Sequence, residues 1–237
     1  MTFTSTSAPA IYVGKVTDFD VDALVGCLNN NEKAKLSRLR RVADQQLYIV
    51  AHSLKRFVLA RYMDVSPASL LFDTEGNGKP FCTHPEAPFF NLSHSGQWVV
   101  IAVSIDTPVG VDIEFERAVD KDGIVKRIGS DVEVAAYQRS AAPQQHFLCL
   151  WTQKEAVSKA CGQGISVGLS SIPCSGEIGE HCLSFIGVSY VSHTYSFEDK
   201  GIISFVAGTA NKPSIRRAKS APNSSLEQLV EFDIFTL

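Results

Sequence analysis

Three charged residues stand in the segment "WTQKEAVSKACGQG" (residues 151–164): Lys154, Glu155 and Lys159. Glu155 precedes Lys159 by four residues, so on a helix the two side chains share one face, in the orientation that stabilises an ion pair by about 0.2–0.5 kcal/mol. Taken alone, the segment favours a surface salt bridge. The alternative is that the Glu155 carboxylate and the Lys159 ammonium both face a ligand. Other motifs in the chain are needed to distinguish the two interpretations.

A second pair of acids occurs in "GVDIE", where Asp112 and Glu114 are two residues apart. In a strand this spacing places both carboxylates on one face, about 7 Å apart, with the apolar neighbours on the other face. Such a pair at a strand end suits a hard divalent cation. By itself, the pattern is much more typical of a polar, solvent-facing face on an edge strand.

Basic residues are concentrated near residue 40, in a chain with a net charge of -3. The net charge argues against general nucleic-acid binding, which usually requires a basic surface. The local cluster is either a phosphate-binding patch or a solvated helix face. Its members are Lys33, Lys35, Arg38, Arg40 and Arg41, and Lys55 and Arg56 come later in the chain.

Helices are predicted in two regions that must position these charges. Apolar spacings of three to five residues between 31 and 62 predict one or two helices, with a break near Val42 and Asp44 as a candidate cap. A helix is expected over about 144–161, ended by Gly162. Before it, Ser130 and Glu133 form a capping-box signature.

Strands are predicted between and after the helices. Residues 89–92, 98–105 and 109–115 are apolar or β-branched runs separated by turn signals. "FDTEGNGKPFC" is a turn region that holds Lys79 between a glycine and a proline. Further antiparallel strands are expected in "HCLSFIGVSYV", "HTYSFE" and "GIISFVAGTA", whereas "NKPSIRRAKSAPNSS" is typical of a polar loop. This order of elements favours an α+β fold.

The composition is that of an ordinary globular protein, with 45% hydrophobic and 20% charged residues among 237. The length allows one large domain or two of about 100–120 residues. Six scattered cysteines without a C-x-x-C pair indicate reduced thiols. The first 15 residues do not resemble a signal peptide, and no apolar run reaches about 18 residues, so we expect a cytoplasmic protein that binds neither membrane nor nucleic acid.

The blocks "GKP", "NLSHSG", "GVDIE" and "WTQKEAVSKACGQG" occur in this fixed order. Together they resemble the 4′-phosphopantetheinyl transferase superfamily, of the Sfp-like (surfactin-synthetase-activating) type. The family pattern has a (V/I)G(V/I)D(I/V)E strand and a W-(S/T)-x-K-E-(A/S)-x-x-K-A-x-G helix, and the chain matches both at nearly every position. The resemblance extends from the basic helices near Lys35 to Gly164.

The resemblance implies two similar α+β subdomains in a pseudo-twofold arrangement, over residues 1–105 and 106–237, with the active site between them. The implied reaction moves 4′-phosphopantetheine from coenzyme A to a serine of an apo acyl- or peptidyl-carrier protein. It depends on Mg2+ and releases adenosine 3′,5′-bisphosphate. Because one chain supplies both halves of the site, a monomer is expected.

The resemblance also implies roles for residues at the matching positions. Asp112, Glu114 and Glu155 correspond to the metal-binding acids, and Glu155 is in addition a candidate general base. Lys159 corresponds to a residue that contacts the pyrophosphate, whereas the role of Lys154 is left open. Coenzyme A contacts are implied for a further set: Lys35, Arg40, Lys79, Ser93 and His94.

The chain departs from some relatives in its first half. Leu47 and Tyr48 replace an Arg and a Thr, and Glu32 stands where some members carry a Lys, so Arg56 or Lys55 are alternative phosphate contacts. Two other classes of function remain: a coenzyme A or carrier-protein binder without catalysis, and a different Mg2+-dependent phosphate enzyme. The first would be expected to lack one of the acids or Lys159, and no P-loop supports the second.

Overall fold

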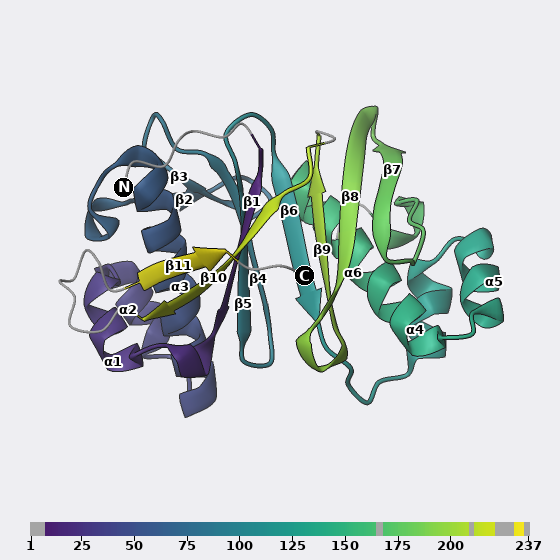
Figure 1. Cartoon of the computed structure of the whole chain (residues 1–237), viewed down its shortest axis with the longest axis horizontal. Helices are drawn as coiled ribbons and strands as arrows, with labels where there is room; N and C mark the ends of the chain where they lie inside the picture. Colours follow the sequence, from purple (N-terminus) through teal and green to yellow (C-terminus); the bar gives the residue numbers. More distant parts are fainter. Residues whose placement is uncertain (1–7, 165–167, 209–210, 221–229, 235–237) are drawn as a thin grey trace. The chain divides into compact units, whose positions relative to one another are not determined.

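The computed structural model describes residues 8–164, 168–208, 211–220 and 230–234. The chain forms two compact units (Figure 1). Unit 1 consists of residues 1–73, 80–106 and 213–236, and unit 2 of residues 74–79, 107–212 and 237. These units differ from the predicted division into 1–105 and 106–237 in two segments: residues 74–79 group with unit 2, and residues 213–236 group with unit 1.

Unit 1 is built on a five-stranded sheet in the order β11-β10-β1-β5-β4. β1 pairs antiparallel with β5 and parallel with β10, while β4 and β11 add antiparallel strands at the two sides. A separate two-stranded sheet pairs β2 with β3. The strands are β1 (Ala10–Lys15), β2 (Phe72–Thr74), β3 (Pro80–Cys82), β4 (Phe89–Ser95), β5 (Trp98–Ser104), β10 (Ser214–Ser220) and β11 (Val230–Ile234).

The long helix α3 (Val42–Met63) contacts β1, β4 and β5, and its buried side chains form one core with those strands. α3 begins after Arg41 as its N-cap residue, so the prediction that Asp44 caps it was wrong; Asp44 lies inside the first turn, where its charge favours the helix dipole. The shorter helical elements are η1 (Val16–Asp18), α1 (Val21–Leu24), η2 (Val25–Cys27), α2 (Asn30–Leu36) and η3 (Pro67–Ser69).

Unit 2 has a four-stranded antiparallel sheet in the order β6-β9-β8-β7. The helix α6 (Pro143–Cys161) packs against β6 and β9 and buries Ala156, Val157 and Ala160 in the core. The strands are β6 (Val109–Glu114), β7 (Gly179–Phe185), β8 (Val188–Phe197) and β9 (Gly201–Ala207). The remaining helical elements are α4 (Lys121–Ile128), α5 (Asp131–Arg139), η5 (Leu169–Ser171) and η6 (Glu198–Lys200).

The two units repeat one order of elements. In each, a first strand is succeeded by short helices, one long helix, a 3-10 turn and antiparallel strands, and the first strand pairs with the last of these. The strand order β1-β5-β4 in unit 1 thus corresponds to β6-β9-β8 in unit 2. The prediction of two similar α+β subdomains is confirmed at the level of the elements within each unit.

One local prediction was wrong. The segment "NKPSIRRAKSAPNSS" contains the strand β10, because Ile215 and Ala218 are buried and the backbone pairs with β1. The antiparallel strands expected in "HCLSFIGVSYV" and "HTYSFE" are confirmed: the first segment is a hairpin with a turn at Ile186–Gly187, and its second strand continues to Phe197. None of the helices in the described part of the chain combines the length and apolarity needed to cross a bilayer.

Candidate active site

The close approach of β6 to α6 depends on Gly110. A Cβ atom at this position would lie 1.9 Å from the Ala156 carbonyl oxygen and 2.6 Å from the Ala160 backbone nitrogen. Neither backbone atom can yield without displacing the helix, so any larger residue would separate the two elements. Gly110 therefore allows the strand that carries Asp112 to lie directly against the helix that carries Glu155 and Lys159.

Lys159 reaches from α6 to the strand. Its Nζ donates to Asp112 Oδ1 at 2.6 Å and to the Val111 carbonyl oxygen at 3.3 Å. Asp112 is only 4% exposed, so this ion pair is screened by water far less than a pair on a helix surface. The helix spacing of Glu155 and Lys159 does not by itself predict this arrangement.

Glu155 is partly buried and electrostatically coupled to both strand acids. Burial raises the pKa of its carboxyl group, the charge of Asp112 raises it further, Lys159 lowers it, and Glu114 raises it slightly. Glu114 itself accepts a 3.4 Å hydrogen bond from the largely exposed Arg117. Three carboxyl groups and one ammonium therefore gather where β6 and α6 meet.

Lys79 lies beside the same two elements. Its Nζ donates to the carbonyl oxygens of Ala160, at 3.2 Å, and Val109, at 3.5 Å, and burial lowers the pKa of its ammonium group. Asn77 of the same turn donates to the Gly162 carbonyl oxygen at 3.2 Å. The glycine-rich turn predicted from the sequence is thus attached to the C-terminal end of α6.

The other four predicted site residues belong to unit 1. Lys35, on α2, and Arg40, between α2 and α3, are exposed. Ser93 and His94 are adjacent on β4; Ser93 is buried and His94 is exposed. Of the nine predicted site residues, the structure therefore places five in unit 2: Lys79, Asp112, Glu114, Glu155 and Lys159. The last four interact with one another where β6 meets α6.

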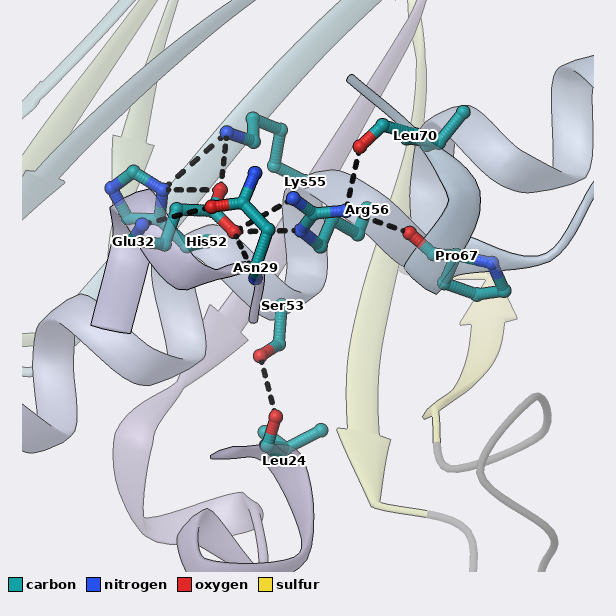
Figure 2. A network of polar contacts seen from close by, with 9 residues as sticks. All are labelled: Leu24, Asn29, Glu32, His52, Ser53, Lys55, Arg56, Pro67 and Leu70. Carbon is teal, nitrogen blue, oxygen red and sulfur yellow. Dashed lines mark hydrogen bonds and ion pairs between the residues drawn. The ribbon is translucent and has the colours of Figure 1, made fainter. Parts of the chain in front are cut away.

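The alternative that Arg56 or Lys55 contacts a phosphate does not agree with the structure. Both side chains are buried, Arg56 completely, and both are bonded to Glu32, as Figure 2 shows. Glu32 is the counter-ion of these two cations. Exposed residues such as Lys35 are left as the candidates for phosphate contacts in unit 1.

The donor set where β6 meets α6 fits a hard divalent cation. Within the described residues, no three His, Cys, Asp or Glu side chains are already arranged around a common metal position. Mg2+ needs only one or two carboxylates, because it keeps waters and binds substrate phosphates. Asp112 and Glu114 offer two carboxylates, and Glu155 offers a third. The Lys159 ammonium already places a positive charge at Asp112.

One buried ion pair next to the site was not predicted. Lys154 is fully buried, and its Nζ lies 3.0 Å from both carboxylate oxygens of Glu133. The capping-box signature identified Glu133 correctly, since its backbone and side chain both bond to Ser130. Nothing in the local sequence indicates that the same carboxylate also receives a lysine from 21 residues further along the chain.

Two family models match the chain. The model described as "4′-phosphopantetheinyl transferase superfamily" matches residues 108–210, and "4′-phosphopantetheinyl transferase, N-terminal" matches residues 16–106. The boundary between them, at residues 106–108, lies where unit 1 gives way to unit 2 at Thr107. The residues that meet between β6 and α6 all fall within the first match, except Lys79.

Curated relatives are also transferases by name. The chain is 37% identical over 153 residues to "4′-phosphopantetheinyl transferase psf-1" of Bacillus pumilus. The matched region covers 64% of this chain and 65% of that protein. It is 32% identical over 152 residues to a 4′-phosphopantetheinyl transferase of Bacillus subtilis, covering 63% and 67%. The matched region thus spans about two thirds of the relatives' length.

A solved structure, the holo-[acyl-carrier-protein] synthase of Thermotoga maritima, aligns with 49% of this chain and 70% of that chain, at a TM-score of 0.31 and 16% identity. The family assignment rests on the two family models and the Bacillus subtilis relative, together with the matching blocks. The chain belongs to the 4′-phosphopantetheinyl transferase superfamily.

Proposed function

We propose that this protein transfers 4′-phosphopantetheine from coenzyme A to a serine hydroxyl of an apo acyl- or peptidyl-carrier protein, with Mg2+, and releases adenosine 3′,5′-bisphosphate. The observation that carries the proposal is the convergence of Asp112, Glu114, Glu155 and Lys159 where β6 meets α6. These four residues lie inside the region that matches the superfamily.

The transfer requires a proton acceptor. The serine oxygen forms a bond to the phosphorus that carries pantetheine, and the bond from that phosphorus to the bridging pyrophosphate oxygen breaks. Glu155 takes the serine proton, directly or through a water. Its environment favours this role, because burial raises the pKa of the carboxyl group and makes it a stronger base.

Lys159 supplies positive charge during the transfer. Its ammonium is partly exposed and contacts Asp112, and we expect it to face the pyrophosphate of bound coenzyme A. A lysine serves here as a movable point charge that stabilises the negative charge developing on the phosphate oxygens. In unit 1, the exposed Lys35, Arg40 and His94, with Ser93, are proposed to contact coenzyme A.

Mg2+ would be held by Asp112 and Glu114, with Glu155 as a third donor. When bound, the ion neutralises the pyrophosphate and activates it as an electrophile. Glu155 cannot be a full metal ligand and a strong base at the same moment, because a metal-bound carboxylate is a weaker base. The strand acids Asp112 and Glu114 are therefore the primary ligands in the proposal.

Product analysis tests the proposal against its two rivals. The protein is incubated with coenzyme A and Mg2+, with and without an apo-carrier protein, and adenosine 3′,5′-bisphosphate is quantified by chromatography. We expect the nucleotide to appear only when the apo-carrier is present. Release without a carrier would indicate a hydrolase, and no release with any carrier from fatty-acid, polyketide or peptide synthesis would indicate a binder without catalysis.

A further inference from the structure

A buried carboxylate connects three segments of unit 2. Glu133, at the third position of α5, accepts the Ser130 backbone N–H at 2.7 Å and the Cys174 backbone N–H at 2.8 Å. Its third partner is Lys154 of α6, at 3.0 Å. The same ammonium donates to the carbonyl oxygens of Leu169 and Ile172, so its three N–H groups are all satisfied by buried acceptors.

Unit 1 contains an arrangement of the same kind, drawn in Figure 2. Glu32, at the third position of α2, accepts the Asn29 backbone N–H at 3.0 Å and pairs with Arg56 of α3 at 2.7 Å. Arg56 Nη1 then donates to the carbonyl oxygens of Pro67, at 2.9 Å, and Leu70, at 3.0 Å. Lys55 and His52 add bonds to the other oxygen of Glu32.

The two arrangements correspond element by element. Each consists of a capping-box glutamate on a short helix, a buried cation on the next long helix, and two carbonyl oxygens three residues apart in the 3-10 turn after that helix. Glu32 and Arg56 therefore occupy the positions of Glu133 and Lys154. We call each arrangement a clamp, because it fixes the long helix against the segments before and after it.

The two clamps differ in the residues that come after the cation on the long helix. In α6, the residue after Lys154 is Glu155, and Lys159 is five positions on; in α3, the residue after Arg56 is Phe57, which is buried in the core. Only in unit 2 is the cation of the clamp therefore followed, on the same helix, by residues assigned to the chemical step. Lys154 itself is fully buried, so it cannot touch coenzyme A or the carrier.

We propose that Glu133 and Lys154 are positioning residues for the transfer: the unit 2 clamp fixes the rotation of α6 and thereby holds Glu155 and Lys159 at the reacting groups. The clamp of unit 1 joins α3 to α2, which carries Lys33 and Lys35 of the basic cluster near residue 40. This inference rests on the proposed function. It assigns a role to Lys154 that the spacing of charges along the helix leaves open.

The test uses paired substitutions, because a single one leaves a buried charge without its counter-ion. Glu133→Gln combined with Lys154→Met removes both charges of the unit 2 clamp, while glutamine preserves the bonding to Ser130. Glu32→Gln combined with Arg56→Met is the matched change in unit 1. Both double variants are first shown to unfold cooperatively, and kcat and the KM for coenzyme A are then measured well below their melting temperatures.

We expect the unit 2 double variant to lose about tenfold or more in kcat, with the KM for coenzyme A changed less than about threefold, because misplaced reacting groups affect the transition state rather than ground-state binding. The unit 1 double variant should show the opposite split, with a raised KM. The single variant Lys154→Arg retains the buried positive charge, so its kcat should lie between those of the unit 2 double variant and the parent protein.

A folded unit 2 double variant with the kcat of the parent protein would overturn the proposal. Equal losses of kcat in both double variants would also overturn it.

Amide hydrogen exchange separates failure of this inference from failure of the proposed function. The clamp predicts faster exchange in the last turns of α6, including residues 157–161, in the unit 2 double variant than in the unit 1 double variant. This comparison needs no turnover. Unaltered exchange in α6 would contradict the clamp even if the parent protein is an active transferase, and altered exchange would support it even if no activity is found.

Discussion

Glu155 and Lys159 lie one helical turn apart, but their surroundings differ. Lys159 donates to the buried Asp112 of β6, whereas Glu155 is partly buried with a raised pKa. The sequence predicts that both side chains share a face, because helical spacing is a local property. It does not predict the partner of Lys159, because that contact joins residues 47 positions apart and depends on how β6 packs on α6.

Glu155→Gln is expected to lower the rate of transfer by at least about 100-fold, because glutamine cannot accept the serine proton. Coenzyme A binding should change little, since the substitution keeps the size of the side chain. Turnover is measured with an apo-carrier protein and coenzyme A binding by calorimetry. Glu86→Gln, at an exposed position of unit 1, is the control. Near-normal turnover by the Glu155→Gln variant would remove Glu155 from the proposed mechanism.

Asp112→Asn is expected to raise the Mg2+ concentration that gives half-maximal activity by about tenfold, because an amide oxygen is a weaker ligand than a carboxylate. The same change also leaves the Lys159 ammonium without the negative charge that it now faces. A Mg2+ titration of the transfer rate provides the measurement. If the variant and the parent protein gave superimposable titrations, Asp112 would not be a metal ligand.

At the scale of elements, the contact between β6 and α6 is the feature that positions the site. The sequence predicts both elements to within a few residues, since "GVDIE" alternates as a strand and Gly162 ends the helix in the left-handed conformation. It also predicts the capping box of α5 correctly. The tertiary partners of the buried charges could not be predicted, because Glu133 and Glu32 each meet a cation more than 20 residues further along the chain.

Gly110→Ala tests the close approach of the two elements. Overpacking against the backbone of α6 should reduce the free energy of unfolding by about 1–3 kcal/mol, and displacement of α6 should also lower the rate of transfer. Denaturant unfolding gives the first quantity and the carrier assay the second. Gly76→Ala is the matched control, because a Cβ there meets no atom within 4 Å; equal effects of the two substitutions would contradict the packing argument.

Glu32→Gln tests the electrostatics of the unit 1 clamp. Burial alone would raise the pKa of Glu32, but the hydrogen bond with His52 and the charges of Lys55 and Arg56 outweigh it and hold the pKa well below its ordinary value. Because the pKa is lower in the folded state, the carboxylate stabilises the fold fully above its unfolded-state pKa of about 4.3, and this stabilisation is lost as the pH falls toward the folded-state pKa.

The substitution should therefore cost roughly 3 kcal/mol of unfolding free energy at neutral pH, because Arg56 is left buried without its counter-ion. The difference between the parent protein and Glu32→Gln should shrink markedly at about pH 3, where the unfolded parent chain is largely protonated at this position. Urea unfolding at the two pH values measures it. A difference independent of pH would show that the ionised carboxylate does not stabilise the fold.

At the scale of the whole molecule, the last strands return to the first unit. β10 pairs in parallel with β1, in the register Ala10–Ser214 to Gly14–Ala218, although roughly 200 residues separate the partners. The sequence indicates only a polar loop there, because Arg216, Arg217 and Lys219 outnumber the two buried apolar residues and no local signal reveals a partner so distant. The division at residue 106 could be predicted, because the family resemblance implies that the "GVDIE" strand opens the second half.

Removal of residues 213–237 should destabilise unit 1 more than unit 2. The deletion takes away β10, including the buried Ile215 and Ala218, and leaves one edge of β1 without its hydrogen-bonded neighbour. We expect a lower melting temperature and faster amide exchange in β1, with smaller changes in β6. Unchanged exchange in β1 would show that the sheet of unit 1 does not require β10.

The most direct test of the proposed transfer is the intact mass of a carrier protein after incubation with this protein, coenzyme A and Mg2+. We predict a gain of one phosphopantetheine group on the apo-carrier, none on a carrier whose acceptor serine is replaced by alanine, and none when Glu155→Gln replaces the parent protein. An unmodified apo-carrier, tested across the carriers of fatty-acid, polyketide and peptide synthesis, would contradict the proposed transfer.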